Sequence, residues 1–406
     1  MIRSACLVLW CLTVAQSITA QQQNLDPNQP LPIDPEVIID TLDNGLTYYV
    51  RVNERPEDRA ELRLVVKAGS VLEDEDQLGL AHFLEHMAFN GTEHFEKQEL
   101  FDYMESVGMQ TGAHTNASTS FDETIYMLRV PTDTADVVET AFQILEDWAH
   151  LIVLDSVEIE KERGVVIEEW RLGRGAQARM LDEQLPILFR NSRYAERLPI
   201  GRRESVETFE HESLRRFYAD WYRPSLMAVV AVGDFEADRI VELINQHFTG
   251  LENSVNASKR EIFDVPEHEE MLFAIAADAE APNTTVGLYH KQPLRDQSTV
   301  GAYRQMLVEG LFNSMLNARL FELTQQADAP FLFGKIHHKH KVLLTVGAQL
   351  RGDSVGEVAI QRAFQIELVP QFGVKIIQKT LVVAGGHVVR LPFAKRVDRE
   401  CRVAGV

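Results

Sequence analysis

The stretch that decides the fold is residues 79–92, which read GLAHFLEHMAFNGT. Its apolar residues recur at the spacing of one helix face, so a helix is expected over residues 78–87. These residues are Leu80, Phe83, Leu84 and Met87. An acidic run at residues 73–76 precedes the helix and suits its N-terminus, because negative charge is favourable at that end of the helix dipole.

The same stretch places two histidines and a glutamate on one side of the helix. His82 and His86 are four residues apart, so both rings project from one face and can share a metal ion. Glu85 is three residues from His82 and can reach water beside that metal. Zinc suits this set because it accepts nitrogen and carboxylate ligands and lowers the pKa of bound water to roughly 7. The order His-x-x-Glu-His is the signature of inverted-motif zinc peptidases; the alternative is a solvated helix face.

A third ligand is expected from a second helix, over residues 157–171, which is rich in carboxylates. Glu162 and Glu169 are seven residues apart and therefore share a face of that helix. Helix geometry alone does not choose between Glu168 and Glu169 as the ligand. Most of the carboxylates are expected to be simply exposed; the candidates are Glu158, Glu160, Glu162, Glu168 and Glu169.

The rest of the chain predicts an α+β fold. Asn44-Gly45 lies between two apolar runs, a strong hairpin signal, and strands at 48–50 and 62–66 would continue it as a β-meander. Further strands are expected at 124–130, 228–232, 271–276 and 284–289, and further helices at 97–107, 135–152, 214–222, 237–248 and 299–325. The order of elements in the second part resembles that in the first, which suggests a duplicated α+β unit.

Composition divides the chain into four segments. Residues 1–20 carry a positive charge, an apolar run and then small residues, the pattern of a cleaved signal peptide. A polar, irregular stretch near residue 260 places a boundary between a first domain at 21–255 and a second at 265–360. The tail at 361–406 holds eight Lys and Arg against three Asp and Glu, whereas the preceding residues hold 32 against 58. This tail is predicted to be an unusual terminal element or sequence foreign to the domain.

Charge and cysteine content exclude several classes of protein. The formal net charge of −21 argues against a nucleic-acid-binding protein, which needs a concentrated basic surface. Cys6 and Cys11 fall in the leader, so Cys401 is left without an intramolecular disulfide partner. After the leader no stretch reaches about 18 consecutive apolar residues, and no membrane span is expected. These features fit an exported bacterial protein, periplasmic or extracellular.

Five stretches together resemble the pitrilysin family of zinc peptidases, which includes insulin-degrading enzyme and mitochondrial processing peptidase. They are residues 79–92, Asn116-Ala117, residues 162–170 (ERGVVIEEW), residues 198–201 (LPIG) and residues 217–224 (FYADWYRP). The resemblance runs from about residue 36 to about residue 355 and is strongest to bacterial envelope members of the family.

The resemblance implies a role for each site residue. His82, His86 and Glu169 would hold one zinc ion per chain, with Glu85 as general base and Glu162 as a supporting carboxylate. Asn116 and Ala117 would lie on a sheet edge to which a substrate peptide adds as a further strand, a mode that gives little sequence specificity. By composition alone the segment around them reads as an exposed edge or loop.

The implied fold is α+β with tandem related domains, each a mostly antiparallel sheet covered by helices, with zinc in the first and the second incomplete near residue 360. The implied function is a zinc-dependent endopeptidase acting on peptides or unfolded polypeptide segments. The chain resembles only about one half of the larger members, so hydrolysis could require a homologous partner half or a homodimer. The alternative is a non-catalytic peptide-binding or assembly subunit.

Overall fold

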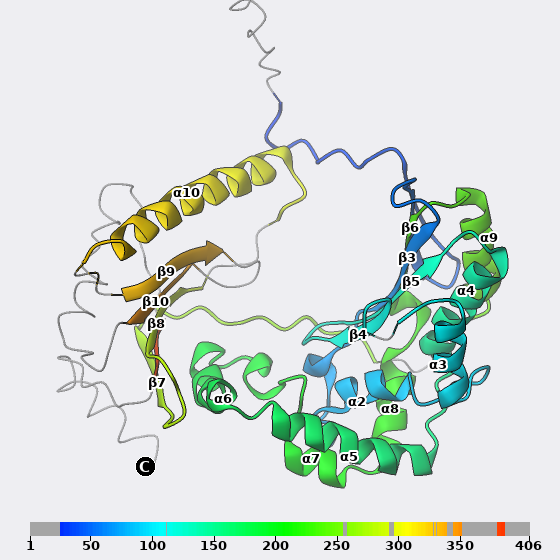
Figure 1. The fold of residues 1–406 in the computed structure, drawn as a ribbon, viewed down its shortest axis with the longest axis horizontal. Helices are drawn as coiled ribbons and strands as arrows, with labels where there is room; N and C mark the ends of the chain where they lie inside the picture. The colour runs from blue at the N-terminus through cyan, green and yellow to red at the C-terminus, as the bar shows by residue number, and fades with distance from the viewer. Residues whose placement is uncertain are drawn as a thin grey trace, which may run out of the picture.

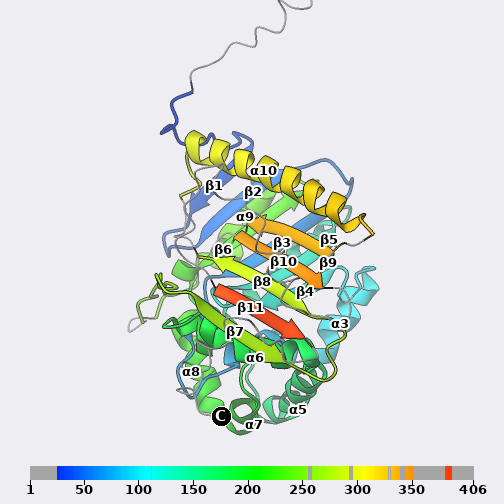
Figure 2. The same ribbon diagram turned by 90° about the vertical axis from the view of Figure 1, so that its left-hand side faces the viewer.

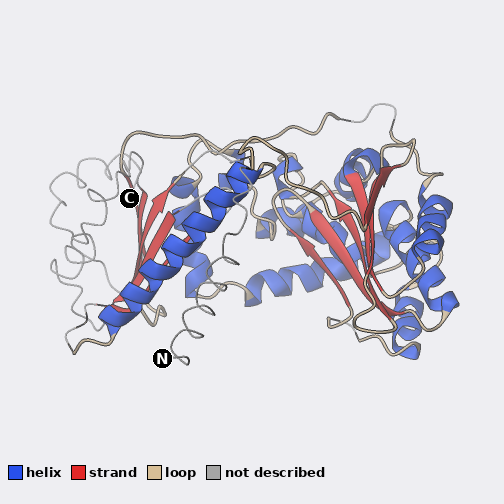
Figure 3. Cartoon of the chain, turned by 90° about the horizontal axis from the view of Figure 1, so that it is seen from above, coloured by secondary structure: helices blue, strands red, loops and turns tan. Residues whose placement is uncertain are grey.

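The computed structural model describes residues 25–110, 112–254, 258–291, 296–327, 329, 331–338, 344–350 and 380–385. For residues 337–338 and the last two segments only the backbone is described. This part of the chain forms two separate sheets, each with its own helices (Figures 1 and 3). The predicted leader at 1–20 and most of the tail at 361–406 lie outside the described residues.

The first sheet has the strand order β1-β2-β6-β3-β5-β4. Neighbouring strands are antiparallel except β2 and β6, which are parallel. The predicted hairpin at Asn44-Gly45 is confirmed and joins β1 to β2. The strands are β1 (Val37–Thr41), β2 (Thr47–Val52), β3 (Arg59–Val66), β4 (Thr115–Thr119), β5 (Thr124–Pro131) and β6 (Met227–Gly233).

The predicted β-meander is wrong, because β6 lies between β2 and β3. β6 reads MAVVAVG and has no polar side chain to turn toward solvent, so a central position with a neighbour on each side suits it. The link from β2 to β3, residues 53–58, is long enough to step over one strand. Adjacent strands in the sequence are not always adjacent in the sheet, and here a strand from far along the chain intervenes.

Helices cover the first sheet, and α4 lies against β5 and α9. Trp148 and Phe142 of α4 are fully buried in the core of this unit. α2 is surrounded by α5, α8 and β4, so it is an interior helix. The helices are α2 (Leu80–Met87), α3 (Lys97–Ser106), α4 (Ala135–His150), α5 (Ser156–Leu172), α6 (Ala176–Leu188), α7 (Arg203–Thr208), α8 (His211–Trp221) and α9 (Ala237–Phe248), with short 3-10 turns at Ser70–Leu72, Arg193–Glu196 and Pro224–Leu226.

The second sheet repeats the topology of the first. Its order is β7-β11-β8-β10-β9, and only β7 and β11 are parallel (Figure 2). Strand for strand this matches β2-β6-β3-β5-β4, including the position of the parallel pair. The elements are β7 (Leu272–Ala277), β8 (Thr285–His290), α10 (Val300–Thr324), β9 (Phe331–His338), β10 (Leu344–Leu350) and β11 (Thr380–Gly385). β11 falls within the segment that the sequence sets apart as a basic tail.

The helix α6 joins the two units. It follows α5 in the chain but packs on β7 of the second sheet, where Met180 and Ala276 are buried together. Arg179 adds two hydrogen bonds to Asp278, of 2.7 and 2.8 Å, and one of 2.6 Å to Glu280. α6 and α7 are absent from the sequence prediction, because Pro186 interrupts the helical pattern of α6 and α7 is only six residues long.

The predicted α+β class is confirmed, and so are the main helices, with α9 matching its predicted bounds and α4 and α5 differing by one or two residues. The division at residues 255–265 stays a prediction. Within the described part of the chain, every helix is too short or too polar to cross a bilayer.

Candidate metal centre

The helix α2 presents two histidine rings next to each other. His82 and His86 have ring centroids 4.7 Å apart at an interplanar angle of 81°. On the other faces of the helix, Leu80, Phe83 and Leu84 are fully buried in the core. Their packing fixes the rotation of α2 about its axis. At its start, buried Glu73 from the acidic run accepts hydrogen bonds from the N–H groups of Gly79 (3.0 Å) and Ala81 (2.9 Å).

Glu169 of α5 faces both histidines. Its carboxylate oxygens lie 3.8 Å from His82 Nε2 and 3.3 Å from His86 Nε2. One possible ligand atom from each of the three residues lies within 4.8 Å of the other two. Glu168, left open by helix spacing, instead pairs with Arg171 at 2.8 and 2.6 Å. The structure thus brings together His82, His86 and Glu169.

Glu162, two turns before Glu169, holds the other nitrogen of His86. Its Oε1 lies 2.8 Å from His86 Nδ1, and its Oε2 accepts a hydrogen bond of 2.7 Å from Asn90 Nδ2. Burial alone would raise the pKa of Glu162, but the hydrogen bonds of His86 and Asn90 outweigh it and lower the pKa. Burial lowers the pKa of His86, but the hydrogen bond and charge of Glu162 outweigh burial and raise it. The carboxylate therefore leaves His86 Nε2 free to face Glu169.

His82 has the electrostatics of a neutral ligand. Burial, followed by the neighbouring His86, lowers its pKa to about 4, against the attraction of Glu169. Its Nδ1 is buried and has no hydrogen-bond partner among the described residues. Two imidazoles, one of which donates its second N–H to a carboxylate, together with a glutamate form a donor set that zinc prefers. The residues present therefore fit a zinc ion.

Glu85 lies beside these donors but is not one of them. It is 9% exposed, and its Oε2 accepts a hydrogen bond from Thr119 Oγ1 at the end of β4. Burial raises the pKa of Glu85, although the Thr119 hydrogen bond and the charge of His86 oppose the rise. A buried carboxylate whose pKa is raised is a stronger base than an exposed one, which suits a proton acceptor.

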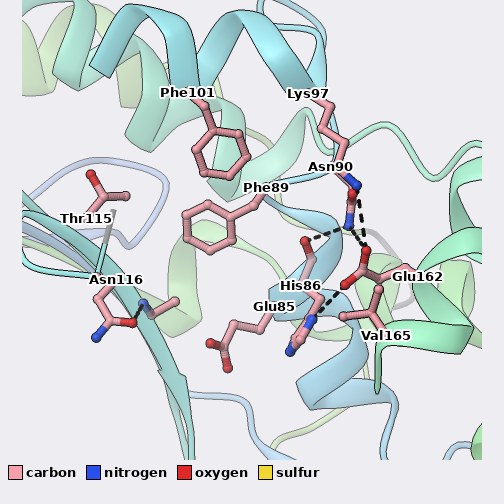
Figure 4. Close-up of a pocket in the computed structure, with 12 residues that line it drawn as sticks. Glu85, His86, Phe89, Asn90, Lys97, Phe101, Thr115, Asn116, Glu162 and Val165 are labelled. Carbon is pink, nitrogen blue, oxygen red and sulfur yellow. Dashed lines mark hydrogen bonds and ion pairs between the residues drawn. The ribbon is translucent and has the colours of Figure 1, made fainter. Parts of the chain in front are cut away.

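A cavity of about 390 Å³ opens between α2, α5 and the edge strand β4 (Figure 4). β4 pairs with β5 along one edge. Along its other edge β4 has no partner strand among the described residues. Asn116 and Ala117 of β4 line the cavity, and Asn116 lies on the side opposite Glu162. The rest of its lining is Glu85, His86, Phe89, Asn90, Lys97, Phe101, Gly112, Thr115 and Val165.

Sequence reasoning missed three polar residues of this region: Asn90, Lys97 and Thr119. Asn90 is four residues after His86, so helical spacing could have pointed to it. Thr119 is two residues beyond Ala117, the last residue that the sequence assigns to the substrate strand. Lys97 lies 3.8 Å from Glu162 Oε2, a long-range contact that no local pattern reveals.

Comparison with known families adds a second line of evidence to this geometry. Residues 48–196 match the insulinase domain of peptidase family M16, and residues 208–366 match the inactive domain of peptidase M16. The chain belongs to peptidase family M16. Relatives in this family are named as zinc proteases, which supports a peptidase.

Individual curated proteins are similar to this chain over most of its length. It is 40% identical over 326 residues to "Zinc protease PQQL-like" of Arabidopsis thaliana, covering 80% of this chain and 34% of that protein. It is 29% identical over 348 residues to "Probable zinc protease PqqL" of Escherichia coli strain K12, covering 84% of this chain and 37% of that protein. The chain thus spans little more than a third of the length of these curated relatives.

Solved structures of peptidases superpose on this chain and share its fold. The first half of the periplasmic protease PqqL from Escherichia coli superposes with a TM-score of 0.73 at 30% identity, covering 80% of this chain and 70% of that chain. Pitrilysin superposes with a TM-score of 0.62 at 19% identity, covering 81% of this chain and 35% of that chain, which shows the shared fold.

Proposed function

We propose that this M16 chain is a zinc-dependent endopeptidase. His82, His86 and Glu169 would hold one zinc ion, Glu85 would act as general base, and Glu162 would support His86. The observation that carries the proposal is the convergence of three possible metal ligands from two helices beside buried Glu85, which lines the cavity together with His86. The names of its relatives support the metal and the reaction class.

Zinc, when bound, would supply a Lewis acid that polarises the scissile carbonyl and acidifies water. Glu85 accepts the proton of the attacking water as the water oxygen bonds to the carbonyl carbon. It then gives that proton to the amide nitrogen as the C–N bond breaks. Thr119 holds Glu85 Oε2, so the other carboxylate oxygen remains for the proton transfer.

The substrate is proposed to be a peptide or an unfolded segment of polypeptide. The free edge of β4 can take such a chain as a further antiparallel strand, with Asn116 and Ala117 beside it. Backbone hydrogen bonds of this kind need an extended substrate, so a folded domain would not fit. The acidic chain favours approach by basic or neutral peptides.

The alternative is a non-catalytic peptide-binding or assembly subunit. It is suited by the edge of β4 that has no partner strand among the described residues, since this edge could hold an extended peptide without cleaving it. Groups that orient a substrate would in either case be supplied by this chain, by a homologous partner half or by a second copy. We also propose export to a bacterial envelope, in line with the periplasmic location stated for PqqL of Escherichia coli.

The test compares wild type with Glu85→Gln, and with Glu252→Gln as a matched exposed control. We expect zinc near one per chain in all three by elemental analysis. Cleavage of an unstructured fluorogenic peptide should fall by about a hundredfold or more in Glu85→Gln alone. If zinc-loaded wild type never cleaves such peptides, alone or mixed with a homologous half, the catalytic proposal fails and the peptide-binding subunit is favoured.

A further inference from the structure

Behind His86 lies a short chain of hydrogen bonds that ends in an asparagine. Glu162 binds His86 Nδ1 with one oxygen and Asn90 Nδ2 with the other. Asn90 Nδ2 also donates to the backbone oxygen of His86 at 3.2 Å (Figure 4). The asparagine therefore ties the end of α2 to Glu162 on α5.

The chemistry around Asn90 requires a donor. The groups facing its amide are a carboxylate oxygen and a carbonyl oxygen, which both accept hydrogen bonds. A flipped amide would place Asn90 Oδ1 against these two acceptors, so the NH₂ group must face them. Asn90 is 7% exposed, and its Oδ1 has no hydrogen-bond partner among the described residues. If the hydrogen bond from Asn90 to Glu162 is removed, water and neighbouring groups therefore replace it poorly.

We propose that Asn90 is a positioning residue of the metal centre, which orients Glu162 and, through it, His86. By occupying Oε2 it leaves Glu162 Oε1 to accept from His86 Nδ1–H, and this fixes the tautomer whose Nε2 lone pair faces the metal. The inference rests on the proposed zinc site but extends it to a residue other than His82, Glu85, His86, Glu162 and Glu169.

Lys97 does not replace this role. Its Nζ lies 3.8 Å from Glu162 Oε2, beyond hydrogen-bond distance, and its side chain is 48% exposed. A half-exposed charge is screened by solvent and sets no direction for the carboxylate. Asn90, with a hydrogen bond of 2.7 Å in a buried position, sets that direction.

The test measures zinc affinity by competition with a chromophoric chelator. Asn90→Asp keeps the shape but faces Glu162 with a second carboxylate, and zinc affinity should fall by about ten- to a hundredfold. Asn90→Ala removes the donor without adding charge and should weaken zinc binding by roughly three- to tenfold. Asn245→Asp, at an exposed position of α9, is the matched control and should leave affinity unchanged.

A second readout separates orientation from damage to the fold. In zinc-loaded protein, the His86 Nδ1–H resonance should lie far downfield in wild type and move upfield in Asn90→Ala, with thermal unfolding checked on both. Wild-type affinity in both Asn90 variants, or an unmoved resonance, would overturn the role of Asn90. If wild type itself binds no zinc, the proposed metal centre fails instead; if it binds zinc but cleaves nothing, only the catalytic proposal fails.

Discussion

Single residues in this chain sit in environments that differ sharply over short distances. His82 and His86 are one turn apart, yet the pKa of the first is lowered to about 4 while that of the second is raised. The difference comes from one partner, since Glu162 reaches His86 Nδ1 while His82 Nδ1 is buried without a partner among the described residues. Identical residue types in one motif therefore differ in pKa because of what surrounds their second ring nitrogen.

Glu146 offers a test of such electrostatics away from the metal centre. It accepts from His247 Nδ1 at 2.7 Å and lies 3.5 Å from His150 Nε2. Burial opposes ionisation, but the two histidines outweigh it and lower the pKa of Glu146 to about 2. A lowered pKa means that the stability it contributes is present above the ordinary value and is lost as pH falls toward about 2.

Glu146→Gln should therefore destabilise the protein by about 1–3 kcal/mol near pH 6 and by less near pH 3, where part of the contribution is already lost. Thermal or urea unfolding of both proteins at the two pH values measures the difference. Glu139→Gln, an exposed change on the same helix, should have little effect at either pH. An equal loss from Glu146→Gln at both pH values would contradict the role of its charge.

At the residue scale, sequence predicted the parts of the site that follow from local spacing. His82, Glu85 and His86 share one helix, so their common side follows from helical period alone. Glu169 needed the family resemblance, because only the packing of α5 on α2 separates it from Glu168. Thr119 could not be predicted, since its contact with Glu85 depends on how β4 approaches α2. The roles of these residues remain proposals that the zinc and cleavage experiments test.

At the scale of elements, two glycines allow another loop to approach the start of α2 closely. Gly79, just before α2, has φ of +96°, and Gly201 has φ of +71°. A Cβ on Gly201 would lie 2.4 Å from Gly79 Cα, so the loop that carries Gly201 touches the backbone at the start of α2. Neither position admits a side chain without moving the helix.

Gly201→Ala should lower the free energy of unfolding by about 2–4 kcal/mol and weaken zinc binding, because both the clash and the positive φ oppose it. Gly164→Ala is the matched control inside α5, where a new Cβ meets no atom within 4 Å. That change should stabilise by roughly 0.5–1 kcal/mol through helix propensity. Chemical denaturation of the two variants measures both effects, and similar values would argue against the close contact.

The sequence predicts the bounds of single helices and strands better than it predicts which elements lie next to one another. The predicted bounds of α4, α5 and α9 agree with the structure within two residues. The position of β6 was missed, because a non-local pairing leaves no periodic signal in either partner. α6 is absent from the prediction because Pro186 interrupts its helical pattern.

At the scale of the molecule, two units of the same strand order are joined through α6. Met180 is buried against Ala276, and Arg179 bridges to Asp278 and Glu280. Met180→Asp would bury an unpaired charge at this junction. We expect limited proteolysis of the variant to speed up by about tenfold or more in the second unit, while zinc content stays at the wild-type level.

Leu181→Asp is the matched control for this junction, since Leu181 is the next residue on the same helix and is exposed. It should digest at the wild-type rate. Loss of zinc from Met180→Asp would show that the junction also affects the first unit. It would contradict the expectation that the first unit keeps its structure when the junction is disrupted.

The order β7-β11-β8 has a consequence for synthesis of the chain. β7 is made early in its unit, but β11, the strand beside it in the described sheet, comes off the ribosome only after residue 380. Until then both β7 and β8 carry an open edge toward the missing strand, and open edges are templates for aggregation. A nascent chain stalled before that residue would therefore need a chaperone more than the finished one.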